Sequence, residues 1–99
     1  AMQRLTLAQL LLDQNEFPEA ESHLLAAVDM NREYTAAWKA LGKVRQQAGD
    51  PDGATEAWSR GIEIAREYGD KQAEKEMTVF ARRLEKSDSG QARRARNQP

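Results

Sequence analysis

The chain has 99 residues, of which 39% are hydrophobic, 31% are charged and none is cysteine, a composition that suits one small folded domain and excludes disulfides and thiol chemistry. Residues 1–86 carry 12 basic and 15 acidic side chains, so they lack the basic field of a dedicated nucleic-acid-binding domain. The longest apolar run, Leu10 to Leu12, is far too short to cross a bilayer. The absence of cysteine fits a reducing compartment, so a cytoplasmic protein is expected.

The first two helices are predicted over roughly residues 3–14 and 18–31. Five leucines between positions 5 and 12 indicate the first helix, and Asn15 and Glu16 interrupt its pattern. Pro18 lies in the first turn of the second helix, where a missing N–H group costs nothing. The second helix then carries the spacing of a single buried stripe, formed by Ala20, Leu24, Ala27 and Val28.

The third helix is predicted to begin at Thr35, whose hydroxyl is expected to cap it by accepting a backbone N–H bond. Gly49 would end this helix in the left-handed conformation that glycine adopts readily. Asp50 and Pro51 are the residue types of a helix cap and a first helical residue, so a fourth helix is expected from there to about Tyr68.

A fifth helix is predicted over about residues 70–86. Gly69 would end the fourth helix and Asp70 would cap the fifth, as Gly49 and Asp50 do one helix earlier. Apolar residues follow at helical spacing, namely Ala73, Met77, Phe80 and Leu84.

From position 87 the composition changes to Ser, Gly, Gln, Asn and Arg. Such a segment cannot bury enough apolar surface to offset its ordering entropy, so residues 87–99 are expected to form a flexible basic tail. Its arginines at 93, 94 and 96 leave a weak, salt-sensitive contact with nucleic acid as a minor alternative function.

Residue identities recur along this chain at an offset of 34 positions. Small residues stand at matching places where paired helices must approach closely, as at Ala8 and Gly42. A period of this length is typical of helical solenoids, which display a surface to a partner. The matched identities are Leu7 and Leu41, Ala20 and Ala54, Arg32 and Arg66, Glu33 and Glu67, and Tyr34 and Tyr68.

At Trp38-x-x-Leu41-Gly42 and Ala54-x-x-x-Trp58 the chain resembles the tetratricopeptide repeat family. The resemblance implies an all-α fold, an α-solenoid of two such helix hairpins over about residues 1–34 and 35–68. The fifth helix would cap this right-handed superhelix, giving one domain over residues 1–86. The earlier copy matches at Leu7, Ala8, Leu11, Ala20, Leu24 and Ala27.

In this family the first helix of each hairpin lines a concave groove that binds a peptide or another protein's helix. The resemblance therefore implies a non-catalytic protein–protein interaction module. Arg45 departs from the pattern, because it stands where an aromatic residue is usual. Carried over by position, the groove-facing residues would be Leu5, Gln9, Leu12 and Asp13; then Lys39, Lys43, Gln46 and Gln47; then Lys71, Glu74, Lys75, Thr78 and Arg82.

Four lysines would converge in this groove, at positions 39, 43, 71 and 75. Some family members hold a partner's terminal carboxylate there with Lys, Arg and Asn, so an acidic or C-terminal segment is the implied ligand. The asparagines of that clamp are not matched in this chain. The alternative is that the lysines merely solvate an exposed helix face.

The leucines of the first helix cover more of its circumference than one core stripe requires, so part of that surface would face water. A preceding helix, a second copy of the chain or a partner could cover it, or the extra leucines could pack internally. A homodimer through Leu5 and Leu12 is therefore the second function considered.

No constellation for catalysis or metal binding stands out in the sequence. His23 has no partner histidine or cysteine at metal-ligand spacing, and the turn at 50–53 lacks the later ligands of a calcium loop. Trp38 and Trp58 occupy repeat positions typical of core residues. We expect no enzymatic activity and no cofactor.

Overall fold

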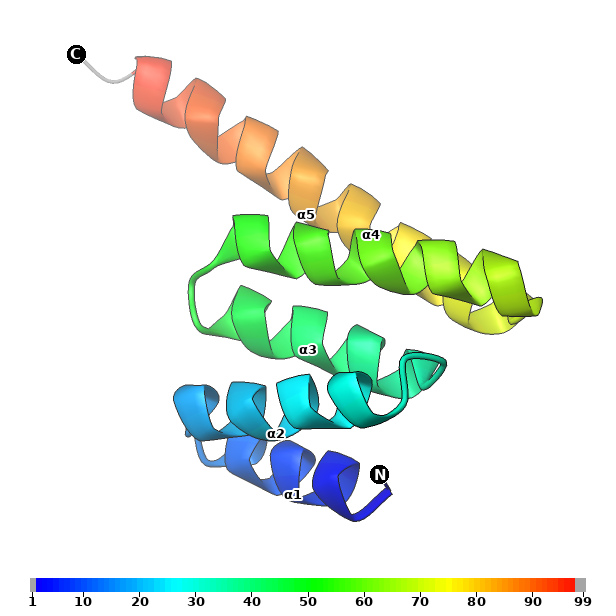
Figure 1. Cartoon of the computed structure of the whole chain (residues 1–99). Helices are drawn as coiled ribbons and strands as arrows, with labels where there is room; N and C mark the ends of the chain where they lie inside the picture. The colour runs from blue at the N-terminus through cyan, green and yellow to red at the C-terminus, as the bar shows by residue number, and fades with distance from the viewer. Residues whose placement is uncertain (1, 98–99) are drawn as a thin grey trace.

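The structure is a computed structural model that describes the backbone of residues 2–97 and the side chains of residues 4–86. This part of the chain forms five α-helices and no strand: α1 (Met2–Asp13), α2 (Phe17–Met30), α3 (Thr35–Gln47), α4 (Pro51–Tyr68) and α5 (Lys71–Asn97). The helices stack in chain order, with α5 laid against α4 at the end opposite the N-terminus (Figure 1). This is the α-solenoid that the repeat predicted.

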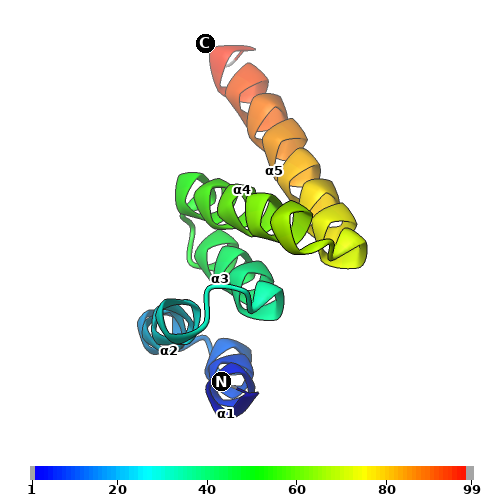
Figure 2. The ribbon, with the colours of Figure 1, turned by 45° about the vertical axis from the view of Figure 1, so that its right-hand side comes forward.

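The helices form two layers. The α3 helix contacts both α1 and α5, whereas α2 and α4 do not contact each other, although each packs on α3. Figure 2 shows α2 to the left of α1 and α3. The first helices of the units therefore make one face of the molecule, and α2 and α4 make the other.

Three of the predicted helix boundaries are confirmed in detail. Asp50 caps α4, because its Oδ1 accepts the backbone N–H of Gly53 at 3.0 Å. Gly49 and Gly69 have φ angles of +86° and +74°, the left-handed region in which a side chain is strained. Asn15, which ends α1, adopts the same region at +62°.

Thr35 does not have the capping role predicted for it, since the residue before α3 is Tyr34 and no side chain caps this helix. Its hydroxyl instead donates a hydrogen bond of 2.8 Å to Oδ2 of Asp70. The other oxygen of Asp70 accepts the N–H of Ala73 at 3.1 Å and so caps α5. Thr35 thus ties the start of α3 to the start of α5, a tertiary bond that local sequence does not reveal.

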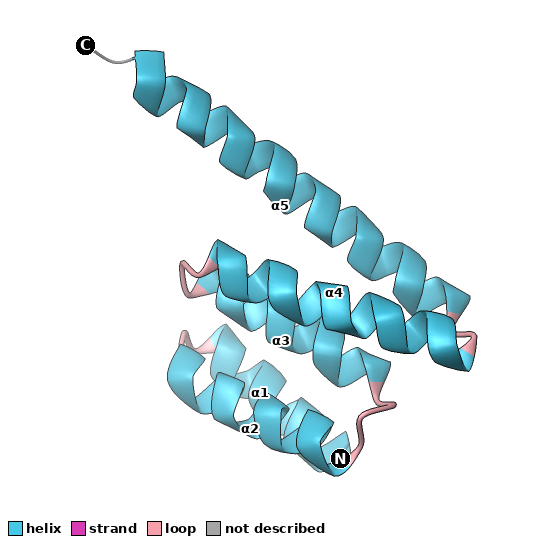
Figure 3. Ribbon diagram, turned by 45° about the horizontal axis from the view of Figure 1, so that its top comes forward, coloured by secondary structure: helices cyan, strands magenta, loops and turns pink. Residues whose placement is uncertain are grey.

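The α5 helix is longer than predicted, since it continues to Asn97 and not only to about residue 86 (Figure 3). Once a helix is nucleated by packing on a neighbour, residues with fair helix propensity such as Ala, Gln and Arg can extend it without an apolar stripe. The side chains of 87–97 and residues 98 and 99 lie outside the described residues, so the flexibility predicted for 87–99 stays a prediction.

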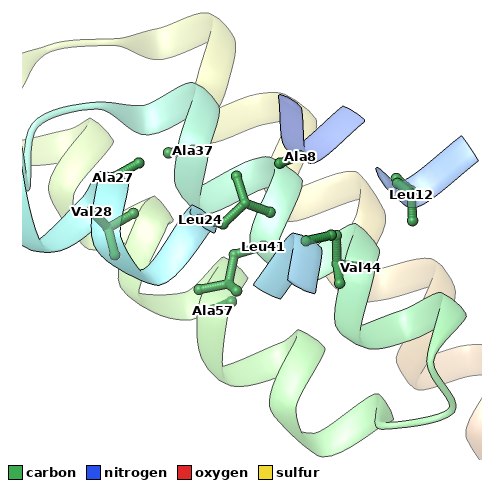
Figure 4. Close-up of a cluster of buried hydrophobic side chains, with 10 residues drawn as sticks. Ala8, Leu12, Leu24, Ala27, Val28, Ala37, Leu41, Val44 and Ala57 are labelled. Atoms are coloured by element: carbon green, nitrogen blue, oxygen red, sulfur yellow. The ribbon is translucent and has the colours of Figure 1, made fainter. Parts of the chain in front are cut away.

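The core consists of two apolar clusters that meet at Trp38. The larger one joins the first four helices through side chains such as Leu12, Leu24 and Leu41 (Figure 4). The smaller one joins α4 to α5 through Trp58 and Met77, both 0% exposed. Because α5 covers α4 in this way, it closes the second hairpin as the repeat requires.

Trp58 packs closely against α3. Its Nε1 donates a 3.1 Å hydrogen bond to the carbonyl oxygen of Lys39, and its indole ring lies directly over Gly42. A methyl group at position 42 would overlap that ring. Glycine is therefore required here for packing.

Arg45 replaces the aromatic residue that the family pattern would place on α3. Its Nε lies 3.0 Å from Oε1 of Glu21 on α2, and its Nη1 donates to the carbonyl oxygen of Gly53 on α4 at 3.1 Å. One partly buried arginine thus joins three helices by polar contacts where the family uses an apolar ring.

Candidate partner-binding groove

Two hollows lie between α3 and α5 on the face made by the first helices of the units. The first, which we call the Phe80 hollow, has a volume of about 300 Å³. Its lining combines two cationic groups, two amides and one aromatic ring, provided by Lys43, Gln46, Gln47, Phe80 and Arg83.

Phe80 connects this hollow to the core. Its ring centroid lies 5.6 Å from that of Trp58, the largest fully buried side chain, in a tilted arrangement. The Nζ atom of Lys43 lies 4.6 Å from the Phe80 centroid, a cation–π contact. The floor of the hollow is therefore anchored by packing, and a positive charge is held beside it.

The second hollow, of about 240 Å³, lies nearer the start of α3 and is lined by Lys39 and Glu76 among others. Nζ of Lys39 and Oε2 of Glu76 form an ion pair at 2.8 Å. The hydrogen bond from Lys39 lowers the pKa of Glu76, so this carboxylate is ionised at neutral pH. The positive charge of Lys39 is thereby neutralised within the hollow.

Asp70 lies in the same hollow as a second carboxylate. The hydrogen bond from Thr35, followed by that from the backbone N–H of Ala73, lowers the pKa of Asp70. Both acidic groups are therefore charged and engaged in structural contacts at neutral pH.

The chemistry available on these faces is recognition at an open surface. Among residues 4–86 no charged or polar side chain is buried, and the described side chains include no group of three His, Cys, Asp or Glu residues that could hold a metal. His23 lies beside Arg4, with Nη1 and Nδ1 separated by 3.4 Å. Over the same described part of the chain, no helix is both long and apolar enough to cross a membrane.

The chain is similar over most of its length to a curated protein. It is 47% identical over 87 residues, covering 88% of this chain and 83% of the relative, to a TPR repeat-containing protein of Pseudomonas aeruginosa, where TPR denotes the tetratricopeptide repeat. This chain belongs to the tetratricopeptide repeat family. No family model matches it.

Solved structures support the TPR assignment. A protein of Bordetella parapertussis, determined in solution, is 43% identical with a TM-score of 0.79, and the match covers 87% of this chain and 75% of that one. A tetratricopeptide repeat domain protein of Salinibacter ruber is 26% identical with a TM-score of 0.79, covering 85% of each chain. As a TPR protein, the chain is in general terms a protein-interaction module.

The residues predicted on α3 all line these hollows, and their contact with a partner stays a prediction. Lys43, Gln46 and Gln47 all line the Phe80 hollow, and Lys39 lines its neighbour. The predicted convergence of four lysines is not found, because Lys39 is paired with Glu76 and the two lysines predicted on α5 do not line either hollow.

On α5 three of the lining residues each lie one position later than a predicted residue. One position corresponds to a rotation of about 100° around a helix, enough to move a side chain out of the groove. The shift also replaces two lysines by uncharged or acidic side chains. These lining residues are Gln72, Glu76 and Arg83, where the sequence predicted Lys71, Lys75 and Arg82.

The residues predicted on α1 lie apart from these hollows. Gln9 is exposed, and its Nε2 donates to Oδ1 of Asp13 at 3.1 Å. Leu5 is partly buried against the core. Leu12 is only 7% exposed and is a core residue, so it is not available to a partner in this fold.

Phe80 is the lining residue that sequence reasoning assigned to the core alone. It belongs to the apolar stripe of α5 and does pack against Trp58, but one side of it also forms the floor of the hollow. In the sequence, an apolar stripe looks the same whether its residues pack in the core or also line a hollow. Only the position of α5 relative to α3 separates them.

Proposed function

We propose that this chain is a non-catalytic protein-binding module that holds an acidic segment of a partner, with an adjacent apolar side chain, in the Phe80 hollow. The observation that carries this proposal is the combination of the Phe80 ring with the cationic groups of Lys43 and Arg83. Neither cation has an ion pair among the described side chains. Carboxylates can therefore bind both without breaking an existing pair.

The Phe80 hollow suits this ligand better than its neighbour does. In the neighbouring hollow, the 2.8 Å pair of Lys39 and Glu76 would have to break before a second carboxylate could bind Lys39. The amides of Gln46 and Gln47 can donate to carboxylate oxygens and accept from backbone N–H groups. A C-terminal carboxylate and an internal acidic side chain would both meet these groups.

Selection from a displayed library of random peptides on the immobilised chain tests the proposal. We expect the selected peptides to share Asp or Glu beside one large apolar residue. They should lose binding to a Lys43→Glu, Arg83→Glu variant, because both changes place repulsive charge at the hollow. Selected peptides without acidic residues, or binding that this variant retains, would contradict the proposal.

Self-association through α1 is a second candidate. It is favoured by a comparison of side-chain exposure at equivalent positions of the two repeats. Leu7 and Leu10 are 41% and 54% exposed, whereas Leu41 and Val44, 34 positions later, are each 1% exposed. The later pair lies on α3, against which α2 packs, and the described chain has no helix in the corresponding place beside α1. A second α1 could cover this uncharged stripe.

The solution mass from light scattering tests this second candidate. A dimer is expected that becomes a folded monomer after Leu7→Glu with Leu10→Glu. Gln9→Glu serves as a control on the same helix, since Gln9 bonds to Asp13 and is not part of the stripe. A parent chain that is monomeric at about 100 μM, well above a typical micromolar dissociation constant, would eliminate this candidate.

A further inference from the structure

A hollow of about 680 Å³ opens on the other face of the molecule, between α2 and α4. Because these two helices do not contact each other, the space between them exposes part of α3 beneath. Trp38, on α3, is one of its lining residues. We call this site the Trp38 pocket; it shares no lining residue with the Phe80 hollow.

Four of the seven lining residues of the Trp38 pocket are apolar or aromatic, namely Leu25, Ala26, Val28 and Trp38. Nε1 of Trp38 already donates a 2.9 Å hydrogen bond to the carbonyl oxygen of Arg32, so the ring offers only its apolar surface. Val28 and Leu25 line the wall on α2, and Leu25 is 42% exposed. A large apolar side chain placed here would cover surface that otherwise faces water.

The rim of the pocket carries two guanidinium groups, from Arg32 and from Arg60 on α4. Within residues 4–86 neither group forms an ion pair or a hydrogen bond, in contrast to Arg45 and Arg66, which pair with glutamates at 3.0 and 2.7 Å. Asp29 is the one acidic side chain in the lining, and it pairs with neither arginine. The lining therefore has an excess of unpaired positive charge.

We infer that the Trp38 pocket is a second docking site, which binds an amphipathic acidic segment of a partner protein. The segment places a Phe or Leu side chain on Trp38, and flanking carboxylates pair with Arg32 and Arg60. Arginine suits this role because its planar fork can hold a carboxylate by two hydrogen bonds. A groove between two helices with an apolar floor is a common seat for such a segment.

The repeat supplies an internal comparison for this inference. Position 59, which corresponds to Leu25 one repeat later, is a serine that lines a hollow of about 320 Å³ between α4 and α5. That hollow carries Asp52 and Glu85 and no arginine. The same acidic segment would be repelled there, so the charge of the Trp38 pocket is not a general property of this fold.

The inference is tested by titrating the isotopically labelled full chain with three capped six-residue peptides, followed by nuclear magnetic resonance. The first peptide has Leu-Phe between two pairs of glutamates, the second has Gly-Ser in place of Leu-Phe, and the third has lysines in place of the glutamates. We expect the first alone to shift the indole N–H signal of Trp38 and the amide signals of Leu25 and Arg60. Equal shifts with the second or third peptide would overturn the inference.

Matched variants separate this site from the Phe80 hollow. Arg60→Ala is expected to raise the dissociation constant of the first peptide at the Trp38 signal about two- to fivefold, the range for one exposed ion pair. Leu25→Glu should abolish the shift, and Ser59→Glu, at the same position of the next repeat, should leave it unchanged. A shift that persists in Leu25→Glu, or that is lost only in Lys43→Glu with Arg83→Glu, would mean that the Trp38 pocket is not a docking site.

Discussion

At the scale of single residues, each repeat packs a small residue of its first helix with a large residue of its second helix, and the sizes of the two residues differ between the repeats. The first repeat has Ala8 and Leu24, both buried, at positions where the second has Gly42 and Trp58. The larger indole goes with the smaller glycine, because a methyl group at position 42 would overlap it. The volume lost at one position is thus restored at the other.

This pairing predicts that a substitution at one of the two positions partly compensates for a substitution at the other. Gly42→Ala should lower the free energy of unfolding by about 1–3 kcal/mol through overpacking. Trp58→Leu should also destabilise, by leaving a cavity. The double variant reproduces the first repeat and should cost less than the sum by about 0.5–3 kcal/mol, as measured by urea denaturation. Strictly additive costs would show that the two positions do not compensate.

At the scale of helices, the same tripeptide adopts two structures. Arg-Glu-Tyr at 32–34 forms the turn before α3, whereas Arg-Glu-Tyr at 66–68 completes the last turn of α4. The later copy continues as helix because the stop is delayed to Gly69, whose φ of +74° ends it. The α4 helix is therefore 18 residues long against 14 for α2.

This difference explains which parts of the groove could be predicted. Local signals such as Pro18, Asp50 and Gly49 fixed most helix boundaries. The period predicted the α3 residues that line the two hollows, although their contact with a partner stays a prediction. The longer α4 and the shorter turn after it set the rotation of α5, which no local signal in the sequence contains. Lys71, Lys75 and Arg82 consequently each lie one position before a residue that lines a hollow.

Also at this scale, the ion pair between α3 and α5 predicts a pH dependence. Lys39 lowers the pKa of Glu76 below its ordinary value of 4.5, so the pair stabilises the fold above that value and loses its effect as the pH falls through the lowered pKa. Lys39→Met should therefore be less stable than the parent above about pH 5.5, with a difference that shrinks as the pH falls through the lowered pKa of Glu76.

Chemical denaturation at several pH values measures this difference. Lys75→Met is the control. Lys75 is an exposed lysine on α5 that forms no ion pair among the described residues. A stability difference for Lys39→Met that stays constant down to pH 3, about one unit or more below the ordinary pKa of Glu, would contradict the assignment of this ion pair.

At the scale of the whole molecule, stability depends on continuity between hairpins, because each helix of a solenoid buries its face on its neighbours. Ala20 and Ala54 are both 0% exposed at the same place in the two repeats. Ala54→Glu should unfold the entire domain, since a buried unpaired carboxylate costs several kcal/mol, about as much as a small domain's total stability. Thermal melting by circular dichroism checks this, with exposed Thr55→Glu as the control.

The two faces of this small solenoid each combine two basic side chains with an aromatic ring. The α3–α5 face holds Lys43 and Arg83 around an aromatic floor tied to the core, and the α2–α4 face holds Arg32 and Arg60 around Trp38. We propose that both faces engage a partner without any change in the fold. The Phe80 hollow is the site on which the proposed function depends.

The most direct measurement is the dissociation constant of a library-selected acidic peptide for the parent and two charge-matched variants. One variant carries Lys43→Glu with Arg83→Glu, and the other carries Lys75→Glu with Arg82→Glu, one position outside the groove on α5. We predict that the first pair abolishes binding and that the second leaves the dissociation constant within about threefold, as expected for screened surface charges. Equal losses in both variants would show that net charge, and not the Phe80 hollow, determines binding.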